Sequence, residues 1–333
     1  MLLDGHDPAA IAAAADALAA GELVAFPTET VYGLGARADD DRAVARIYAA
    51  KGRPVGHPLI VHVVDSQAAR FFSDGLPDLA QRLVGAFWPG PLTVIVPRAE
   101  GVASACAGGQ PTIGLRCPAH PVALALLRAA AERGVPGIAA PSANRFGRLS
   151  PTQASHVVAE LGPELQVIDG GACEVGIEST IIDCSRDRAV LLRPGTLTRS
   201  VIEAVLGSPL EDRDAAAPRA PGTLDSHYAP RARVRLMSPD MLRSSLTLLA
   251  SVPADPASEA PLKLAVYSRL LPPAGAVAFH QAMPARADQA AHELFTVLRR
   301  FDDLGAQLIW VEEPPATAEW DGVRDRLLRA SAS

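Results

Sequence analysis

A lysine and an arginine stand two residues apart in a Gly/Pro turn, in the segment KGRP that begins at Lys51. Lys51 is one of only two lysines in the chain, the other being Lys263, and arginine supplies every other cationic side chain. An ammonium beside the guanidinium of Arg53 is suited to binding a polyphosphate. The alternative is an exposed helix end with two solvated cations, and these two residues alone do not decide between them.

Hydroxyl and amide side chains follow a predicted strand of small residues in APSAN, which begins at Ala139. Ser142 and Asn144 would project from the end of that strand, where α/β sheets bind ligands. The alternative is a local turn in which both side chains bond their own backbone. The chain has no GxxxxGK[ST], GxSxG or HExxH segment, and GLG at Gly33 is too short for a dinucleotide fingerprint. This inventory favours binding and positioning of anions over nucleophilic catalysis.

Two arginines end apolar strands, Arg116 in GLRCP and Arg193 in LRPG. Each needs an anion or solvent, so a fork around a ligand carboxylate and a structural ion pair with an acidic side chain are both consistent with the sequence. His62, between two valines, is by itself typical of a strand histidine with satisfied hydrogen bonds. Ser179, directly before a predicted strand, is by itself a weak indication of a binding site. The segment WPGP at Trp88 is interpreted as a structural turn without a chemical role.

The composition is that of a two-domain globular protein of 333 residues with 49% hydrophobic residues. No apolar run is long enough to cross a bilayer. The alanine-rich segment 8–20 lacks a basic leader and contains Asp16, which favours a helix capped by Asp7 and closed by Gly21 over a signal peptide. A cytoplasmic location is therefore expected.

Charge and cysteine content narrow the class of protein further. The net charge of −6 and the aromatic content of 5% are not typical of a nucleic-acid-binding protein. The four cysteines show no CxxC spacing and no zinc pattern, which predicts free thiols in a reducing compartment and no metal bound by the protein itself. They are Cys106, Cys117, Cys173 and Cys184.

Short apolar runs alternate with helical patterns in the first two thirds of the chain. We predict strands at 23–26, 59–64, 92–96, 113–116, 137–140, 180–183 and 190–192. We predict helices at 41–50, 78–87, 122–133, 152–161 and 200–206, the fourth capped by Ser150-Pro151 and ended by Gly162. Mixed spacing between the strands predicts a twisted α/β sheet that is not purely parallel, flanked by helices.

The last third predicts a second, smaller α/β domain. Strands are expected at 263–267, 277–279 and 307–311, and helices at 239–250, 287–304 and 318–330. The segment 208–233 is rich in Pro, Ala and charge and is interpreted as a linker. The predicted organisation is a catalytic domain at 1–207, a linker or lid at 208–233 containing HYAP, and a C-terminal domain at 234–333.

Together these segments resemble the threonylcarbamoyl-AMP synthases of the two-domain Sua5 type, in the Sua5/YciO/YrdC superfamily. The resemblance covers essentially the whole chain, and the ordered set is far more specific than any one motif. The matching segments are PTETVYGLG from Pro27, KGRP from Lys51, HPL from His57, VHV from Val61, FWPGPLT from Phe87, GLRCPAHP from Gly114, APSAN from Ala139, SPT from Ser150, the glycine pair at Gly170 with VGIESTIID from Val175, LRPG from Leu192, and PG…HYAP from Pro221 to Pro230.

The resemblance implies a YrdC-like catalytic domain, a Rossmann-like C-terminal domain and a nucleotidyltransferase activity. Members of this family join L-threonine, bicarbonate and ATP into threonylcarbamoyl-adenylate and release pyrophosphate. The product supplies the N6-threonylcarbamoyl group on adenosine 37 of tRNAs that read codons beginning with A. Mg²⁺ is expected with ATP, held mainly by phosphate oxygens and water. The downstream tRNA threonylcarbamoyl transferase is an implied partner, and direct tRNA binding is not required.

The resemblance also implies roles for individual residues, carried over by motif. The family's nucleotide-site tetrad, taken as catalytic, matches Lys51, Arg53, Ser142 and Asn144. Further ATP contacts match His57, Thr112, Ser150, Arg193 and the lid residue Tyr228. The threonine pocket matches Thr30, His62, Arg116, the backbone of Ala140, and Ser179, with Arg116 as the carboxylate fork.

Two departures from the family pattern affect these implied roles. Relatives often have Met-Lys-Tyr-Arg before the His-Tyr of the linker, whereas this chain has Thr223-Leu224-Asp225-Ser226, which removes two cations and adds an acid. His57 stands where many relatives have Asn, which would make that contact sensitive to pH.

Two other functions are alternatives to this synthase. One is an RNA-binding or ribosome-associated module with a basic concave face. The other is a carbamoyl-adenylate step on a different substrate, as in hydrogenase-maturation relatives, but the accompanying acylphosphatase-like and zinc-cysteine segments are missing. The residues proposed for the basic face are Arg37, Arg42, Arg46, Lys51, Arg53, Arg145 and Arg148.

Overall fold

The computed structural model describes residues 1–224, 227–251, 263–273 and 277–332. It divides into two compact units, which are treated separately below. The first comprises Met1–Phe146 and Ser150–Thr223, and the second comprises Gly147–Leu149 and Leu224–Ser333. The linker predicted at 208–233 thus contributes its first part to one unit and its second part to the other.

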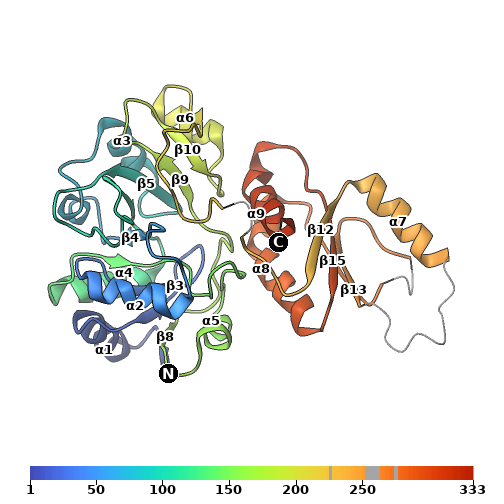
Figure 1. Cartoon of the computed structure of the whole chain (residues 1–333), viewed down its shortest axis with the longest axis horizontal. Helices are drawn as coiled ribbons and strands as arrows, with labels where there is room; N and C mark the ends of the chain where they lie inside the picture. Colours follow the sequence, from blue (N-terminus) through green and yellow to red (C-terminus); the bar gives the residue numbers. More distant parts are fainter. Residues whose placement is uncertain (225–226, 252–262, 274–276, 333) are drawn as a thin grey trace. The chain divides into compact units, whose positions relative to one another are not determined.

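The first unit is built on a mixed sheet (Figure 1). Its strand order is β1-β8-β2-β3-β7-β4-β6-β5-β9-β10-β11. The strands are β1 (Leu2–Asp4), β2 (Val24–Phe26), β3 (Gly33–Arg37), β4 (Ile60–His62), β5 (Leu92–Pro97), β6 (Thr112–Arg116), β7 (Ile138–Ala139), β8 (Gln166–Asp169), β9 (Thr180–Asp183), β10 (Val190–Arg193) and β11 (Glu211–Asp212). Parallel and antiparallel pairs alternate irregularly, for example β4 with β6 in parallel and β5 with β6 antiparallel. The predicted mixed α/β sheet is confirmed.

Helices pack on both faces of this sheet and bury two separate apolar clusters. On one face α1 and α4 pack together through Leu18 and Leu126. On the other, α2, α3, α5 and α6 cover a larger cluster that includes Ile47 and Leu83. The helices are α1 (Pro8–Ala19), α2 (Asp41–Lys51), α3 (Asp78–Phe87), α4 (Pro121–Glu132), α5 (Ala154–Leu161) and α6 (Arg199–Leu206).

The first helix forms as its sequence predicts. The Asp7 side chain accepts a hydrogen bond from the backbone N–H of Ala9, and Pro8 occupies the first turn. Gly21 follows the helix with a φ of 82°, a left-handed conformation that favours glycine. The alanine-rich segment is therefore part of the folded core.

The strands that the sequence did not predict are β1, β3, β8 and β11 in this unit. β3 contains Gly33 and Gly35, and glycine disfavours the prediction of a strand. A Cβ on Gly35 would stand 2.8 Å from Ile138 Cγ2 and 2.9 Å from Phe26 Cε1, so the glycine lets neighbouring strands approach closely. Tertiary packing decides this strand, because its own residues carry no strand propensity.

The first part of the linker, residues 208–223, is a strap that packs against the rest of the first unit. β11 pairs in parallel with β10. Ala217 and Ala220 then pack in an apolar cluster with Ile60, Ile95 and Ile181. Small residues suffice for this contact, which is why the segment shows no apolar period in sequence.

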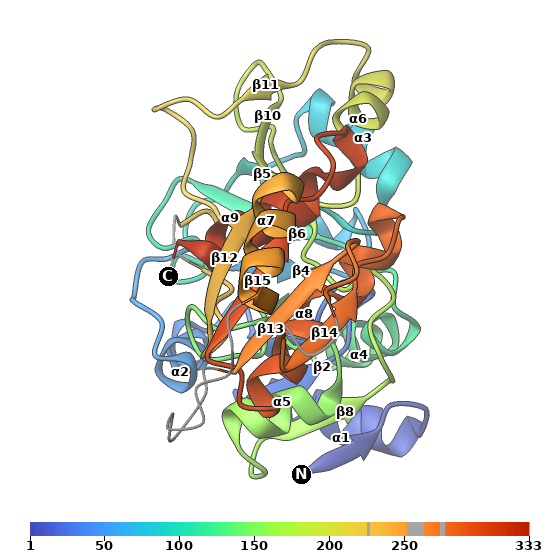
Figure 2. The same cartoon turned by 90° about the vertical axis from the view of Figure 1, so that its right-hand side faces the viewer.

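The second unit is a four-stranded parallel sheet in the order β12-β15-β13-β14. Helix α7 covers one face, and α8 and α9 cover the other (Figure 1). Figure 2 looks onto the face that α7 covers. The elements are β12 (Arg233–Met237), β13 (Leu264–Ser268), β14 (Phe279–Ala282), β15 (Leu308–Glu312), α7 (Pro239–Ser251), α8 (Ala287–Asp303) and α9 (Asp321–Ser331). The predicted smaller α/β domain is confirmed. β12 was missed, because its RVRLM alternation begins at the predicted end of the linker. The strand predicted at 277–279 is shifted, since β14 runs from Phe279 to Ala282.

No helix in the described ranges is long and apolar enough to cross a membrane. All four cysteines are free, as the sequence predicts, and all four are buried. Burial raises the pKa of the Cys117 thiol to about 11, so it is protonated at neutral pH.

Candidate functional site

The residues predicted to bind threonine meet at the ends of two paired strands. Strand β4 ends at His62 and β6 ends at Arg116, and these two residues are partners in the parallel register. The Nη1 of Arg116 donates to Thr30 Oγ1 at 2.8 Å, and its Nε donates to the Gly90 carbonyl at 3.3 Å. The backbone N–H of Ala140 bonds the carbonyl of Ile60, which brings the fourth predicted residue to the same strand. Sequence segments far apart thus converge on one buried guanidinium.

Gly90 belongs to the WPGP segment to which the sequence assigned no chemistry. Its carbonyl accepts from Arg116, and a Cβ on this residue would stand 2.4 Å from the Phe87 carbonyl oxygen. The turn therefore needs glycine, and it fixes the orientation of the arginine.

Arg116 also forms the structural ion pair that the sequence left open. Its Nη2 lies 2.8 Å from Oε1 of Glu29, and both side chains are more than nine-tenths buried. Glu29 stands within PTETVYGLG, between the two threonines, but nothing in its spacing revealed its partner. An acid in an otherwise uncharged turn segment is the signal that could have marked it.

His62 is held in its neutral form. Burial, and secondly the charge of Arg116, lower the pKa of its imidazole to about 3. Its ring meets Phe26 edge to face, with 6.1 Å between ring centroids. At neutral pH this side chain can bind a ligand by hydrogen bonding but brings no charge to the pocket.

The depressed pKa of His62 predicts a dependence of stability on pH. The unfolded histidine takes up a proton near pH 6.5 and the folded one only near pH 3. The free energy of unfolding should therefore fall on acidification between these values, by at most about 1.4 kcal/mol per pH unit from this group. Denaturant midpoints of the wild type and of His62→Asn, at pH 7 and pH 5, measure the effect.

A smaller loss on acidification in His62→Asn than in the wild type is expected. The exposed His6 provides the matched control, and His6→Asn should lose as much as the wild type. Equal losses in all three proteins would mean that His62 is not held neutral by the fold.

Lys51 is buried at the end of α2, with 3% of its surface exposed. Its Nζ donates to the backbone carbonyl of Ser142 at 2.5 Å and to that of Asn144. Burial, and next the neighbouring Arg53, lower the pKa of its ammonium well below the usual value. The interpretation as a solvated helix end is excluded, since the helix places this cation inside the APSAN turn.

Arg53 is buried as well, with 8% exposed. Its Nη2 donates to the Pro58 carbonyl at 3.0 Å, and its guanidinium lies 5.5 Å from the centroid of the Phe146 ring. The same ring meets His57 edge to face, at 5.6 Å between centroids. Burial, and secondly Arg53, lower the pKa of His57. Two predicted ATP contacts therefore share one aromatic support.

Ser150 does not cap α5 as the sequence predicts. The helix begins after Gln153, which makes no side-chain cap. The Ser150 hydroxyl instead donates to a carboxylate oxygen of Glu178, and both residues are buried. A charged acceptor distant in sequence wins over the local backbone, because a charge-assisted hydrogen bond is the stronger one.

Arg193 joins the two groups of predicted residues. Its Nε and Nη2 donate to the Ser179 carbonyl at 3.1 and 2.9 Å, and its Nη2 also donates to Ser179 Oγ at 3.2 Å. Ser179 Oγ in turn lies 2.8 Å from Thr93 Oγ1. The predicted ATP contact Arg193 and the predicted threonine contact Ser179 are thus joined by hydrogen bonds. The sequence did not point to Thr93 as a member of this network.

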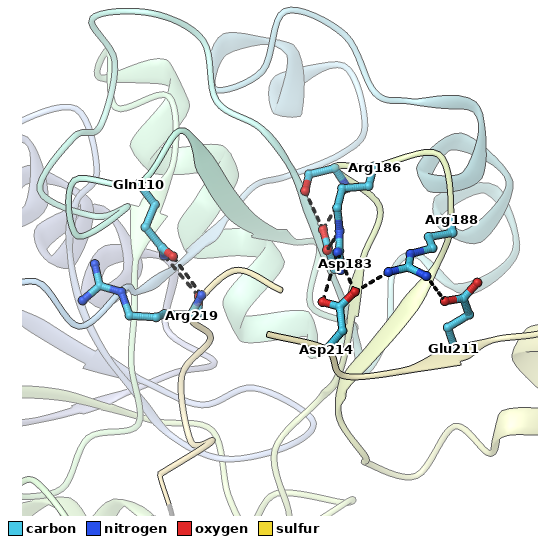
Figure 3. Close-up of polar contacts among 8 residues, drawn as sticks. Gln110, Asp183, Arg186, Arg188, Glu211, Asp214 and Arg219 are labelled. Carbon is cyan, nitrogen blue, oxygen red and sulfur yellow. Dashed lines mark hydrogen bonds and ion pairs between the residues drawn. The ribbon is translucent and has the colours of Figure 1, made fainter. Parts of the chain in front are cut away.

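The strap covers the predicted ATP residue Thr112. Arg219 and Pro221 line, with Thr112 and Gln110, a cavity of about 10 Å³, which is room for little more than one water. The Arg219 N–H donates to Gln110 Oε1 at 2.8 Å, and the Gln110 amide returns a bond to the Arg219 carbonyl at 3.2 Å (Figure 3). This cavity has no room for a ligand larger than a water molecule while the strap is in place.

An ionic clasp, which we define as Asp183, Arg186, Arg188, Glu211 and Asp214, holds the start of the strap (Figure 3). Arg186 lies 3.0 Å from the buried carboxylate of Asp183 and 3.0 Å from Asp214. Arg188 pairs with both Asp214 and Glu211. The hydrogen bond from Arg186 lowers the pKa of Asp214. Asp214 is the strap residue that both arginines share.

Replacing Asp214 should therefore loosen the strap. In Asp214→Asn we expect the β11 and Arg219 amides to exchange hydrogen roughly two- to fivefold faster, the range of a partly exposed ion pair. Amide exchange read by mass spectrometry of peptides from 208–223 measures it. Asp240→Asn, which removes one exposed pair with Arg243 in α7, is the control. Unchanged exchange in Asp214→Asn would show that the clasp does not hold the strap.

Tyr228 belongs to the second unit, and its role as a lid stays a prediction. Its residue is 1% exposed and has a φ of 60°, rare for a side chain of this size. Its ring stacks on Phe295 at 5.6 Å between centroids, and the guanidinium of the fully buried Arg326 lies 5.2 Å from its centroid. Of the altered stretch before it, Asp225 and Ser226 lie outside the described residues.

No group of three or more His, Cys, Asp or Glu side chains within the described parts of the chain forms a metal-ligand cluster. The donor set is one of cations, hydroxyls and backbone groups, which suits an anion. A mixed α/β sheet with a lysine buried at the end of a helix and arginines buried at the ends of strands has the donor set of proteins that bind anionic small molecules.

Comparison with known proteins gives this class a family. A family model for Sua5/YciO/YrdC proteins, described as "Telomere recombination", matches residues 16–195, and the model "Threonylcarbamoyl-AMP synthase, C-terminal domain" matches residues 197–332. The chain therefore belongs to the Sua5 family of two-domain proteins.

Individual relatives match over the whole length. The chain is 38% identical to the threonylcarbamoyl-AMP synthase of Bacillus subtilis, over 99% of this chain and 94% of that protein. It is 38% identical to the synthase of Pyrococcus abyssi, over 93% and 91%. The crystal structure of P. abyssi Sua5 complexed with L-threonine superimposes with a TM-score of 0.89 at 36% identity, covering 99% of this chain and 97% of that one.

Proposed function

We propose that this protein is an L-threonylcarbamoyladenylate synthase, a nucleotidyltransferase that supplies the threonylcarbamoyl group for tRNA modification. It condenses L-threonine, bicarbonate and ATP and releases pyrophosphate. The observation that carries the proposal is the whole-chain similarity to proteins named for this activity, which extends through both domains.

The chemistry agrees with the residues present. The neutral amine of threonine and bicarbonate condense to a carbamate with loss of water, by way of carbon dioxide. The carbamate is already an anionic nucleophile, so no protein nucleophile is required. The carbamate must reach the α-phosphate while charge is neutralised there, a task of positioning and electrostatics. Buried Lys51 and Arg53 suit the phosphate end, together with Ser142 and Asn144 in the turn that Lys51 organises.

At the amino-acid end, Arg116 is the proposed carboxylate fork. Thr30 orients it by a hydrogen bond, and the neutral His62 is its partner in the parallel register of β4 and β6. Ser179 connects this proposed pocket to Arg193, because its carbonyl accepts a hydrogen bond from that guanidinium. His57, Thr112 and Ser150 remain proposed ATP contacts, and Tyr228 a proposed lid.

The proposed Mg²⁺ would arrive with the triphosphate. This fits the donor set, because Mg²⁺ is commonly held by phosphate oxygens and water and needs few protein carboxylates. When bound it would neutralise phosphate charge alongside the two cationic side chains. A cytoplasmic location and delivery of the product to a tRNA threonylcarbamoyl transferase are part of the same proposal, and four free thiols agree with a reducing compartment.

Four of the seven residues proposed for a basic face do not present a free charge to solvent. Arg37 pairs with Asp39 at 2.8 Å and Arg46 with Glu22 at 2.7 Å. Lys51 and Arg53 are buried. This weakens the electrostatic surface that phosphate-dominated binding requires and favours the synthase over the RNA-binding alternative.

Pyrophosphate release from ATP tests the proposed function, with L-threonine and bicarbonate omitted in turn. We expect release only when both are present. Release without threonine, or equally fast release with L-serine, would contradict the pocket around Thr30, His62 and Arg116. Bound ATP without any release would favour a binding role over the synthase.

A further inference from the structure

Glu29 is a buried charge to which the proposed function gives no role. The residue is 5% exposed, and its only ionic contact within the described residues is the 2.8 Å pair with Arg116 Nη2. Neither carboxylate oxygen accepts a well-aligned hydrogen bond from the described part of the chain. Its backbone carbonyl accepts from Val175 N–H at 2.8 Å, which ties this turn of the chain to the segment before β9.

Such a carboxylate is costly to bury. An ionised group with a single contact recovers only part of the hydration that it loses, and buried ion pairs stabilise a fold only when their remaining lone pairs are satisfied. The oxygens of Glu29 therefore have unused capacity to accept hydrogen bonds, directly beside the guanidinium proposed to bind the ligand carboxylate.

The neighbouring guanidinium also has capacity left. Arginine has five N–H donors, and the contacts of Arg116 with Thr30, Gly90 and Glu29 engage three of them. A ligand carboxylate can therefore bind Arg116 while Glu29 stays close. A free amino acid carries an ammonium on the carbon next to its carboxylate, so its two charges match the adjacent Arg116 and Glu29.

The other polar groups around Arg116 cannot replace this anion. His62 is neutral, and Thr30 already accepts from Arg116. Glu178, the acid before Ser179, accepts from the Ser150 hydroxyl.

We propose that Glu29 is the amine-recognising residue of the amino-acid pocket, accepting hydrogen bonds from the ligand ammonium while Arg116 holds the ligand carboxylate. The inference rests on the proposed function for the identity of the amino acid, L-threonine. In the absence of ligand, the Glu29–Arg116 pair keeps the two charges from being buried alone. The pocket is thereby specific for a zwitterion over a simple hydroxy acid.

Ligand binding measured by calorimetry tests the assignment with probes that lack one charge each. The probes are L-threonine, 3-hydroxybutyrate, which lacks the amine, and threoninol, which lacks the carboxylate. In the wild type, 3-hydroxybutyrate should bind at least roughly tenfold more weakly than threonine, the lower range for a hydrogen bond to a charged group. In Glu29→Gln, threonine and threoninol should weaken by a similar factor, and 3-hydroxybutyrate should not weaken.

The exposed Glu100 provides the matched control, and Glu100→Gln should leave all three affinities unchanged. If Glu29→Gln weakens threonine and 3-hydroxybutyrate alike, Glu29 only orients Arg116 and the proposal is wrong. If it tightens both alike, Glu29 competes with the ligand carboxylate, which also overturns it. If Glu29→Gln does not fold, the wild type alone still tests the proposal, because equal binding of threonine and 3-hydroxybutyrate would overturn it.

Failure of the proposed function has a different signature. If threonine binds with the expected dependence on Glu29 but pyrophosphate release does not depend on threonine, amine recognition stands and the synthase does not. If another L-amino acid binds in place of threonine, and its deaminated analogue binds more weakly only while Glu29 is present, the assignment of Glu29 also stands.

Discussion

Arg116→Lys is expected to lower kcat/KM for L-threonine by roughly 100-fold, because two hydrogen bonds between charged groups are at stake. Lysine keeps the positive charge beside Glu29, so the buried acid is not left uncompensated. It cannot reproduce the planar fork that bonds Thr30, Gly90 and a carboxylate together. Initial rates of pyrophosphate release at varied threonine measure the loss.

The affinity for ATP separates a local effect from a general one. We expect Arg116→Lys to bind ATP with the affinity of the wild type. Lys51 and Arg53 are held by hydrogen bonds to the carbonyls of Ser142 and Pro58, and neither bond involves Arg116. Arg128→Lys, at an exposed position on α4, is the matched control and should retain full activity. A variant at Arg116 with wild-type kinetics would remove this residue from the site.

Lys51→Met should lower kcat by roughly 10²- to 10³-fold, the range found when one donor to developing charge is removed. Methionine is similar in length and avoids burying an unpaired charge. The buried ammonium has a lowered pKa in the free protein, and phosphate oxygens nearby would favour its charged form. Turnover at saturating substrates is the measurement.

The only other lysine makes a natural control for this prediction. Lys263 is exposed, directly before β13, and Lys263→Met should turn over like the wild type. Because Lys51 also ties the carbonyls of Ser142 and Asn144, thermal unfolding should be recorded for both variants. A Lys51→Met protein that melts early but turns over normally would show that the residue is structural only.

The helices and most strands around the site could be predicted from the sequence, because burial leaves a local period. α2 follows from the apolar spacing at 41–50, and β4 and β6 follow from the apolar runs at 59–64 and 113–116. The residues at these ends are polar in otherwise apolar surroundings, which makes them conspicuous in the sequence itself.

What failed had no local signal. β3 was missed because Gly33 and Gly35 are there for close approach and not for strand propensity. The cap proposed for Ser150 is wrong because the hydroxyl finds Glu178, which no nearby sequence reveals. The strap was interpreted only as linker because two alanines are enough to pack it on the sheet.

The sequence by itself determined the mixed α/β class, the second α/β domain and the identity of the cationic residues, because apolar periodicity and residue type are local properties. The tertiary structure decided which groups those cations meet. Lys51 donates to backbone carbonyls about 90 residues away in the sequence. Arg116, at the end of β6, contacts Glu29 and Thr30, which lie between β2 and β3. Such partners are set by strand order and register, which arise from the packing of the whole sheet and from no single segment.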